Sequence, residues 1–309
     1  MSKNKPVIYI VGPTASGKTS FSIELAKSFN GEIVSSDSMQ IYKGMHIASA
    51  APDESEKQEI EHHLFEFLNP TESFSVGEYV KCAKTVIDEI HSKGKIPIVV
   101  GGTGLYISAL AENLDFGCGS ADYQLRDELE QFVSENGLLK LYEYLKSIDP
   151  KAAKKISEND KKRIIRAVEI YKTCGKTKTE MDEESKNSGL IYDNLFIGLN
   201  YANRETLYSR INQRVDIMLE NGLIKEAENA YKNVSGTAAQ AIGHKEFFEY
   251  FDGNMKFEDA VEHLKMQTRR YAKRQLTWFR KNDLINWIIM DEDENPLEKA
   301  KNIVKEFLA

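Results

Sequence analysis

Hydrophobic residues in the first third of the chain occur in short runs that alternate with helical patterns. The runs occupy residues 7–11, 32–36, 63–68 and 96–102. Between them, residues 18–29 have a helical pattern, and Ser75 with Glu78 forms an S-x-x-E capping box that predicts the start of another helix. Strand, helix and strand at this spacing are typical of βαβ units, so we predict an α/β fold with a parallel sheet flanked by helices.

The pattern changes in the middle of the chain. From about residue 116 to residue 194 the strand-like runs vanish, and the sequence is charged and helix-forming. Strand-like runs return at 194–201 and 284–290. We therefore predict an α/β core built from residues 1–115 and 195–309, with an all-helical domain at 116–194 inserted into it.

Composition narrows the class of protein. The length of 309 residues suggests about two domains, and 41% hydrophobic with 29% charged residues is ordinary for a globular protein. No segment approaches the ~18 unbroken apolar residues of a membrane span, so no membrane partner is expected. The three cysteines form no C-x-x-C pair, which argues against a disulfide framework and a cysteine zinc site. A cytoplasmic protein is therefore expected.

The net charge does not decide whether the protein binds a nucleic acid. The net charge of −7 argues against a nucleic-acid partner, but RNA is bound by a local basic surface and not by the average charge. Residues 268–281 contain six basic and no acidic residues. A second basic cluster consists of Lys154, Lys155, Lys161, Lys162, Arg163 and Arg166. Taken alone, each stretch is most simply a solvated face.

Residues 11–20, VGPTASGKTS, carry the clearest chemical signal because they fit the P-loop pattern G-x-x-x-x-G-K-[ST]. In such a loop backbone N–H groups and the start of the next helix bind phosphate, Lys18 contacts the terminal phosphates, and the Thr19 hydroxyl typically ligates Mg²⁺. The fold is therefore P-loop NTPase-like. An ATPase also needs an acid at the end of a hydrophobic strand, yet the run at 96–100 ends in Gly101-Gly102-Thr103-Gly104. The loop is predicted to bind a pyrophosphate-like group, and ATP is not required.

Asp37 is the second candidate. It follows the run at 32–36, and ligands bind at the carboxyl ends of the strands in such sheets, so Asp37 should lie beside the phosphate loop. Its carboxylate would hold Mg²⁺ or act as a general base, or it would simply cap the following residues. The residues alone leave these alternatives open.

Six motifs together closely resemble the tRNA dimethylallyltransferases, also called isopentenyl-tRNA transferases, of bacterial type. In order they are GPTASGKT (12–19), SSDSMQIYKGM (35–45), GGTGLY (101–106), DKKRIIRAVEIYKTCGKT (160–177), QAIGHKE (240–246) and RRYAKRQLTWFR (269–280). The resemblance extends over essentially the whole chain. It implies that the loop binds dimethylallyl diphosphate and that the enzyme transfers the dimethylallyl group to a tRNA. The acceptor would be N6 of the adenosine 3′-adjacent to the anticodon, in tRNAs that read codons beginning with U.

The resemblance also implies roles for individual residues. Asp37 matches the general base, Thr103 a threonine that contacts the adenosine, and Arg214 an arginine near the pyrophosphate. The donor pyrophosphate would be bound by Gly12, Pro13, Thr14, Ala15, Ser16, Gly17, Lys18 and Thr19, with Mg²⁺ on Thr19. Contact with tRNA is implied for Asp37, Ser38, Met39, Gln40, Thr103, Arg126, Lys162, Arg163, Ile164, Ile165, Arg166, Gln240, Ala241, Ile242, Gly243, His244 and Lys245.

Simpler interpretations exist for three of these residues. Thr103 would otherwise cap a turn, Arg214 would lie on a solvated helix face, and Arg126 would pair with Glu130 one helical turn away. Beside a phosphate site, however, the two basic clusters favour a channel for the anticodon stem-loop. The target base would have to leave its stack, so aromatic or apolar residues should line its pocket.

Two positions depart from the family pattern. Residues 48–51 are Ala-Ser-Ala-Ala where the family usually has Gly-Thr-Ala-Lys, and His244 replaces a usual tyrosine. Two alternative functions share the phosphate loop. A P-loop kinase of a small metabolite or nucleoside would consume ATP, and an RNA-binding protein with a nucleotide switch would leave the RNA unchanged. No protein partner is implied.

Overall fold

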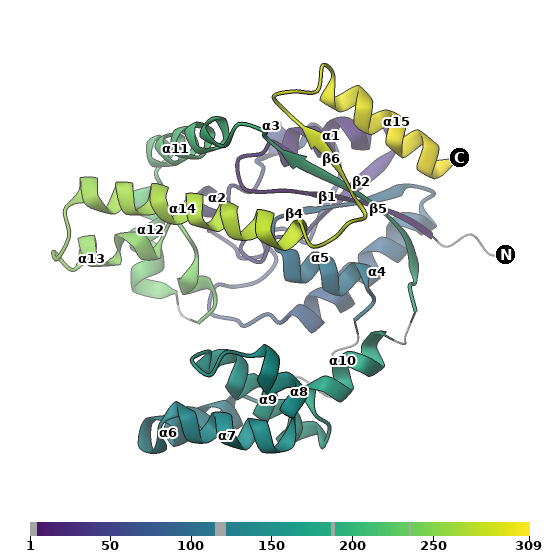
Figure 1. Cartoon of the computed structure of the whole chain (residues 1–309). Coiled ribbons are helices and arrows are strands. Elements are labelled where there is room, and N and C mark those ends of the chain that lie inside the picture. Colours follow the sequence, from purple (N-terminus) through teal and green to yellow (C-terminus); the bar gives the residue numbers. More distant parts are fainter. Residues whose placement is uncertain (1–4, 115–121, 187–188, 235) are drawn as a thin grey trace. The chain divides into compact units, whose positions relative to one another are not determined.

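The computed structural model describes residues 5–114, 122–186, 189–234 and 236–309. They form two compact units, one of Met1–Ala111 with Ile191–Ala309 and one of Glu112–Leu190 (Figure 1). The second unit begins and ends four residues before the boundaries of the predicted helical domain. We call the first unit the core and the second the helical unit.

The core contains a 6-stranded sheet in which every described pairing is parallel. Its strands are β1 (Lys5–Val11), β2 (Gly31–Ser35), β3 (His62–His63), β4 (Ile96–Gly101), β5 (Tyr192–Asn200) and β6 (Ile285–Ile289). They lie in the order β3-β2-β4-β1-β5-β6. The predicted parallel α/β sheet is therefore confirmed. In β1 all residues from Val7 to Val11 are fully buried, as expected for a strand covered on both faces.

The strand suggested by the apolar run at 63–68 was mostly wrong. Only His62 and His63 pair with β2. Leu64 and Glu66 have φ angles of 62° and 43°, which no β ladder allows. Phe65 nevertheless packs against the main hydrophobic cluster, so the run is apolar because a loop is packed onto the core.

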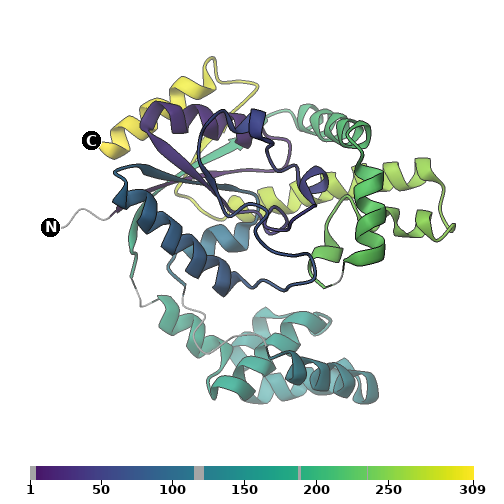
Figure 2. The same ribbon diagram turned by 180° about the vertical axis from the view of Figure 1, so that it is seen from behind.

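Helices cover both faces of the sheet. On one face lie α1 (Lys18–Phe29) and α15 (Pro296–Leu308), and on the other α4 (Val76–Ser92) and α5 (Gly104–Ala111) (Figures 1 and 2). The side chains of β1 alternate accordingly, because Ile8 and Ile10 join the cluster that includes α1 and α15, whereas Tyr9 stacks on Phe196. The predicted capping box is present at the start of α4.

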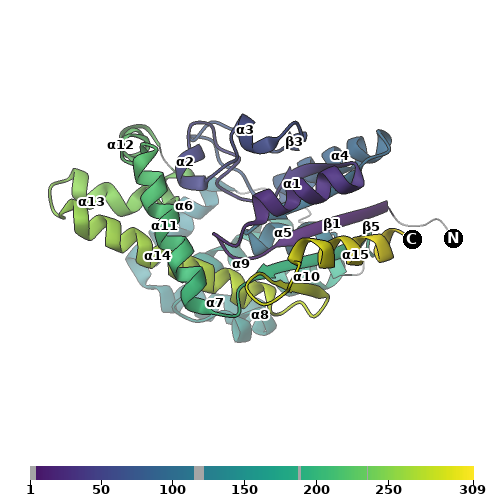
Figure 3. The same ribbon diagram turned by 90° about the horizontal axis from the view of Figure 1, so that it is seen from above.

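Further helices gather beyond the carboxyl ends of the strands (Figure 3). They are α2 (His46–Ser49), α3 (Glu54–Lys57), α11 (Arg204–Glu220), α12 (Leu223–Asn233), α13 (Phe248–Phe251) and α14 (Phe257–Phe279). Helix α14 packs against both α11 and α5. It thereby brings the basic residues of 268–281 close to the end of β4.

The helical unit has its own hydrophobic core. Its helices are α6 (Tyr123–Asn136), α7 (Leu138–Ile148), α8 (Pro150–Lys155), α9 (Lys161–Cys174) and α10 (Lys178–Lys186). Leu145, Ile164 and Val168 are fully buried between them.

The two ends of the interrupted core meet. The side-chain amide of Asn194, where the chain returns to the core, donates to the carbonyl of Ala111, where it leaves, at 3.0 Å.

The structure tests two expectations drawn from the composition, on membrane spans and on the cysteines. Among the described residues no helix combines the length and apolar character needed to cross a membrane. Cys82 is a free thiol whereas Cys174 is disulfide-bonded, although the cysteine spacing had argued against disulfides.

Replacing the fully buried Leu145 with alanine tests whether the helical unit depends on its own core. We expect Leu145→Ala to lower the free energy of unfolding of this unit by about 2–5 kcal/mol, because it removes buried methyl groups and leaves a cavity. Urea denaturation followed by circular dichroism measures the loss. Leu139→Ala is the matched control on the same helix because Leu139 is 59% exposed. Equal losses in both variants would contradict the assignment.

Candidate active site at the phosphate loop

The phosphate loop connects β1 to α1 and has the backbone of an anion site. Gly12, Ala15 and Gly17 have positive φ angles of 150°, 62° and 92°. A Cβ on Gly12 would lie 2.5 Å from the carbonyl oxygen of Leu199, so only glycine fits there. Left-handed residues in a tight turn direct successive N–H groups to one side, where they bind anions together with the start of the helix.

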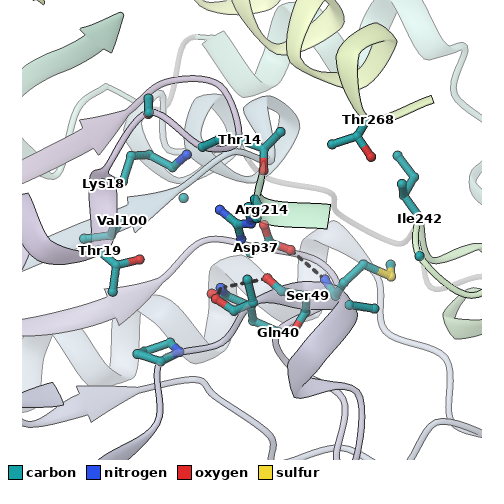
Figure 4. Close-up of a pocket in the computed structure, with 18 of the residues that line it drawn as sticks. Thr14, Lys18, Thr19, Asp37, Gln40, Ser49, Val100, Arg214, Ile242 and Thr268 are labelled. Atoms are coloured by element: carbon teal, nitrogen blue, oxygen red, sulfur yellow. Dashed lines mark hydrogen bonds between the residues drawn. The ribbon is translucent and has the colours of Figure 1, made fainter. Parts of the chain in front are cut away.

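A cavity of about 620 Å³ opens beside this loop (Figure 4). It brings together several of the predicted site residues. The predicted residues that line it are Thr14, Ala15, Ser16, Gly17, Lys18, Thr19, Asp37, Ser38, Met39, Gln40, Arg214, Gln240, Ala241, Ile242, Gly243 and Lys245. Its volume lies in the range of small-molecule sites.

Lys18 is held on the loop itself. Its Nζ donates to the carbonyl oxygens of Gly12 at 3.0 Å and Pro13 at 2.8 Å. Burial, and to a lesser extent the nearby charge of Arg214, lower the pKa of Lys18 to about 7. A bound polyphosphate would replace the two carbonyls and favour the charged ammonium.

Two arginines reach this region from α11. Arg210 donates to the carbonyl of Ala15 at 3.0 Å and so supports the left-handed residue of the loop. Arg214, one turn later, lines the cavity. Burial lowers the pKa of Arg214, and the carboxylate of Asp37 acts in the opposite direction. Lys18, Arg214 and Asp37 thus form one electrostatically linked group.

Asp37 follows β2 and lines the cavity. Its Oδ1 accepts a hydrogen bond from the backbone N–H of Met39 at 2.9 Å. This is an Asx-turn and not the cap of a helix, because the next helix begins only at His46. The turn fixes the orientation of the carboxylate and engages one of its two oxygen atoms.

Thr103 lies directly after β4 and is bonded to the segment that carries Asp37. Its Oγ1 accepts from the backbone N–H of Ser38 at 3.0 Å and donates to the Ser38 hydroxyl at 3.4 Å. Its carbonyl oxygen accepts from the backbone N–H of Tyr106 at 2.9 Å, at the start of α5. Thr103 therefore both starts a helix and holds the neighbouring loop.

The two departures from the family pattern meet at one carboxylate. His244 does not line the cavity; it is fully buried, and its Nε2 lies 2.8 Å from Oε1 of Glu226. Glu226 also accepts from the backbone N–H groups of Ile47 and Ala48, both at 2.9 Å. The residues at 48 and 244 are thus parts of one packed junction at the rim of the site.

Arg126 and the segment 162–166 belong to the helical unit and are described within it. Arg126 pairs with Glu169 at 2.9 Å, and not with Glu130. Arg166 contacts the same buried carboxylate, also at 2.9 Å. Ile164 and Ile165 are buried in the helical core, whereas Lys162 and Arg163 are exposed. Their contact with tRNA stays a prediction.

Two groups of oxygen and nitrogen atoms are candidates for a metal. Among the described residues, Glu32, Glu61 and His63 form the one cluster of three potential ligands. Burial alone would raise the pKa of Glu32, but hydrogen bonds from Lys95, His63 and Lys93 hold it at about 2, so its charge is already compensated. In the cavity, the Thr19 hydroxyl and the Asp37 carboxylate are oxygen ligands of the kind that Mg²⁺ prefers.

The sequence marked 268–281 as a basic stretch, but it did not identify the residues of α14 that line the cavity. Thr268, Tyr271, Arg274 and Gln275 line the cavity from this helix. Its buried residues recur at helical spacing and are Ala260, Leu264, Ala272, Gln275 and Phe279. That spacing places Gln275 on the buried face and would have marked it as a polar residue with a specific partner.

The loop, the cavity and the charged residues around it are those of a phosphate-loop α/β protein with a candidate anion-binding site. A sequence model described as IPP transferase matches residues 40–282. The tRNA dimethylallyltransferase of Caldanaerobacter subterraneus is 46% identical over 310 residues, covering 98% of this chain and 97% of that protein. The tRNA dimethylallyltransferase of Bacillus subtilis is 46% identical over 301 residues, covering 97% and 95%.

Solved structures of proteins with the same description are also similar to this chain. A tRNA isopentenylpyrophosphate transferase from Bacillus halodurans has a TM-score of 0.74 at 43% identity, covering 98% of this chain and 97% of that chain. A eukaryotic dimethylallyltransferase acting on tRNA has a TM-score of 0.86 at 33% identity, covering 98% and 79%. The chain therefore belongs to the IPP transferase family, and the resemblance inferred from the six motifs is confirmed.

The low pKa of Lys18 predicts how diphosphate binding depends on pH. Binding favours the charged ammonium, so above about pH 7 the complex takes up a proton and the affinity falls by up to about tenfold per pH unit. Isothermal titration calorimetry with inorganic pyrophosphate at fixed Mg²⁺, in buffers of different ionisation enthalpy, measures this uptake. In Lys18→Ala the proton uptake due to the lysine should vanish, whereas the proton uptake due to pyrophosphate itself remains. The same pH dependence in both proteins would exclude Lys18 as the source.

Proposed function

We propose that this chain transfers the dimethylallyl group of dimethylallyl diphosphate to N6 of the adenosine 3′-adjacent to the anticodon, in tRNAs that read codons beginning with U. The observation that carries the proposal is that one cavity contains both an anion-binding loop and the carboxylate of Asp37. Membership in the IPP transferase family and relatives named tRNA dimethylallyltransferase support the reaction class. They do not favour the kinase.

The donor side of the reaction needs positive charge. As the bond between the allylic carbon and the diphosphate oxygen breaks, negative charge develops on the leaving group. The phosphate loop, Lys18 and Arg214 line the cavity and would stabilise this charge. Such preorganised electrostatic stabilisation is usually the largest part of catalysis. When bound, Mg²⁺ would neutralise further charge on the diphosphate, with the Thr19 hydroxyl as its protein ligand.

The acceptor side needs a base. The N6 amine attacks the allylic carbon and loses one proton, which Asp37 takes, so diphosphate is released and the adenosine stays neutral. Thr103 and Ser38 hold the loop on which Asp37 lies. The adenosine must leave its stack to reach this point, and Met218, Ile242 and Leu264 give the cavity an apolar wall for it.

The anticodon stem-loop needs a basic surface, which α14 provides. A depression of about 370 Å³ on this helix is lined by Arg270, Lys273, Arg274, Thr277, Trp278 and Lys281. Trp278 is 40% exposed, and the ammonium of Lys281 lies 5.9 Å from the centre of its ring. Cationic groups beside an exposed aromatic ring are typical of surfaces that bind unstacked RNA bases. Because tRNA is the partner, we propose that the protein acts in the cytoplasm.

A single assay separates this function from the alternatives. We would incubate the protein with Mg²⁺, radiolabelled dimethylallyl diphosphate and an unmodified tRNA that reads codons beginning with U, and follow ATP in parallel. Label on the adenosine next to the anticodon, with ATP unchanged, is expected. Turnover of ATP without label would favour the kinase, and RNA binding that depends on ATP without label would favour the nucleotide switch.

Substituting the base tests its role directly. Asp37→Asn keeps an oxygen that accepts from the Met39 N–H but cannot take the amine proton. We expect the single-turnover rate to fall by about 10²–10⁴-fold, with the affinity for tRNA changed by less than about twofold. Rapid-quench transfer assays and filter binding measure the two quantities. Asp53→Asn is a control because this exposed aspartate only caps α3. A variant at position 37 with most of its activity would rule out Asp37 as the base.

The basic depression on α14 predicts a salt effect. Lys273→Ala should weaken tRNA binding and reduce the slope of log K against log salt by about 0.7, because one fewer phosphate is neutralised. Fluorescence anisotropy over a series of salt concentrations gives the slope. Lys301→Ala on α15, where the lysine pairs with Glu298 at 2.9 Å, should leave both values unchanged. An unchanged slope in Lys273→Ala would place the RNA elsewhere.

A further inference from the structure

One face of α14 is pressed against the loop that follows β4. Tyr271, Gln275 and Trp278 are spaced four and three residues apart and therefore lie on the same side of the helix. A Cβ on Gly102 would lie 2.0 Å from Nε2 of Gln275, and one on Gly104 would lie 2.3 Å from Cδ1 of Trp278. These two glycines allow the helix to approach the loop backbone as closely as it does.

Gln275 bridges two loops with one side-chain amide. The side chain is almost completely buried, with 5% exposed. Its Oε1 accepts from the backbone N–H of Thr14 in the phosphate loop at 2.8 Å. Its Nε2 donates to the carbonyl of Gly102 at 3.1 Å. The partners fix the orientation of the amide, because an N–H must meet the oxygen and a carbonyl must meet the nitrogen. Both ends of the amide therefore have partners.

The bridge continues to Asp37. Gly102 is followed by Thr103, whose Oγ1 accepts from the N–H of Ser38, the residue after Asp37. Tyr271 lies one turn before Gln275 on the same helix and also lines the cavity. The path from Thr14 through Gln275, Gly102 and Thr103 thus connects the loop that would bind the donor with the loop that carries the base.

We propose that Gln275 is a positioning residue that fixes the separation between the phosphate loop and the segment carrying Asp37. The proposal rests on the transfer reaction described above, in which an allylic carbon anchored through its diphosphate must meet an amine anchored near Asp37. Gln275 contacts neither reacting atom. It acts by holding Thr14 and Gly102, and a misplacement of about 1 Å between the two sides of such a reaction can reduce the rate by about 100-fold.

Gln275 also determines which donors of the phosphate loop remain for the diphosphate. Because the Thr14 N–H points to Gln275, it does not contribute to the anion nest. Without the amide oxygen, Thr14 would be free to turn its N–H toward the bound anion and change the position of the donor. Loss of Gln275 should therefore affect the rate of the chemical step more than the affinity for tRNA.

Gln275→Met tests this arrangement, because methionine has a similar volume and can form neither hydrogen bond. With both substrates saturating, we expect its single-turnover rate to fall by about 10- to 100-fold. The affinity for tRNA should change by less than about twofold. Gln267→Met is the matched control on the same helix, since Gln267 contacts His263 at 2.9 Å and does not line the cavity. It should transfer at the wild-type rate.

Gln275→Glu gives a second test, because the pH dependence of its transfer rate would not change if Gln275 had only a structural role. A protonated glutamic acid has one O–H donor and one carbonyl acceptor and can form both bonds, whereas the ionised form lacks the donor for Gly102. The rate of the variant divided by the wild-type rate at the same pH should therefore rise as the pH falls. Lys18, Asp37, Arg214, Tyr271 and Arg274 also line the cavity. These groups are present in both proteins, so the ratio removes the part of their effect that is common to the two.

The outcomes are distinguishable. If wild type and Gln267→Met transfer label but Gln275→Met does so at the wild-type rate, with only a lower melting temperature, Gln275 is structural and the proposal is wrong. If Gln275→Met does not fold, a flat rate ratio for Gln275→Glu across pH overturns the proposal and a rising ratio supports it. If wild type transfers no label, the proposed function itself fails.

Discussion

The site depends on the register between two neighbouring parallel strands. Val11 of β1 lies opposite Gly101 of β4, so the phosphate loop and the Gly-Gly-Thr-Gly loop leave the sheet at the same level. β2 pairs with β4 on its other side and delivers Asp37 to the same edge. Loops that follow neighbouring parallel strands lie side by side at the carboxyl edge of the sheet. Arg210 of α11 and Gln275 of α14 then contact the phosphate loop, and a slip of one residue in either pairing would separate Asp37 from that loop.

The fold was predictable where a local pattern determines an element. The strands at 7–11, 32–36 and 96–102, the capping box and the change to helices after residue 116 all follow from periodicity and turn chemistry. The run at 63–68 was misjudged because apolar residues in a packed loop look like those of a buried strand. Backbone conformation there is decided by tertiary packing, which a single sequence does not display.

The site was predictable in part. The glycines and Lys18 identified the loop, and the position of Asp37 at a strand end placed it nearby. The partner of Gln275 could not be foreseen, since Thr14 is 261 residues away in the chain. The same holds for Arg126, which pairs with Glu169 although Glu130 is closer in sequence. Long-range hydrogen bonds of single side chains leave no periodic signal, so motifs located the cavity but not the contacts that shape it.

The hydrogen bond between Asn194 and the carbonyl of Ala111 bears on how the core tolerates the segment inserted between them. It joins the point where the chain leaves the core to the point where it returns, so the core is almost continuous across the interruption. The entropic cost of closing such an insertion rises only slowly with its length, by about 0.6 kcal/mol for each doubling. A change of length within the segment from 112 to 190 therefore need not move the strands of the core or the loops at their carboxyl ends.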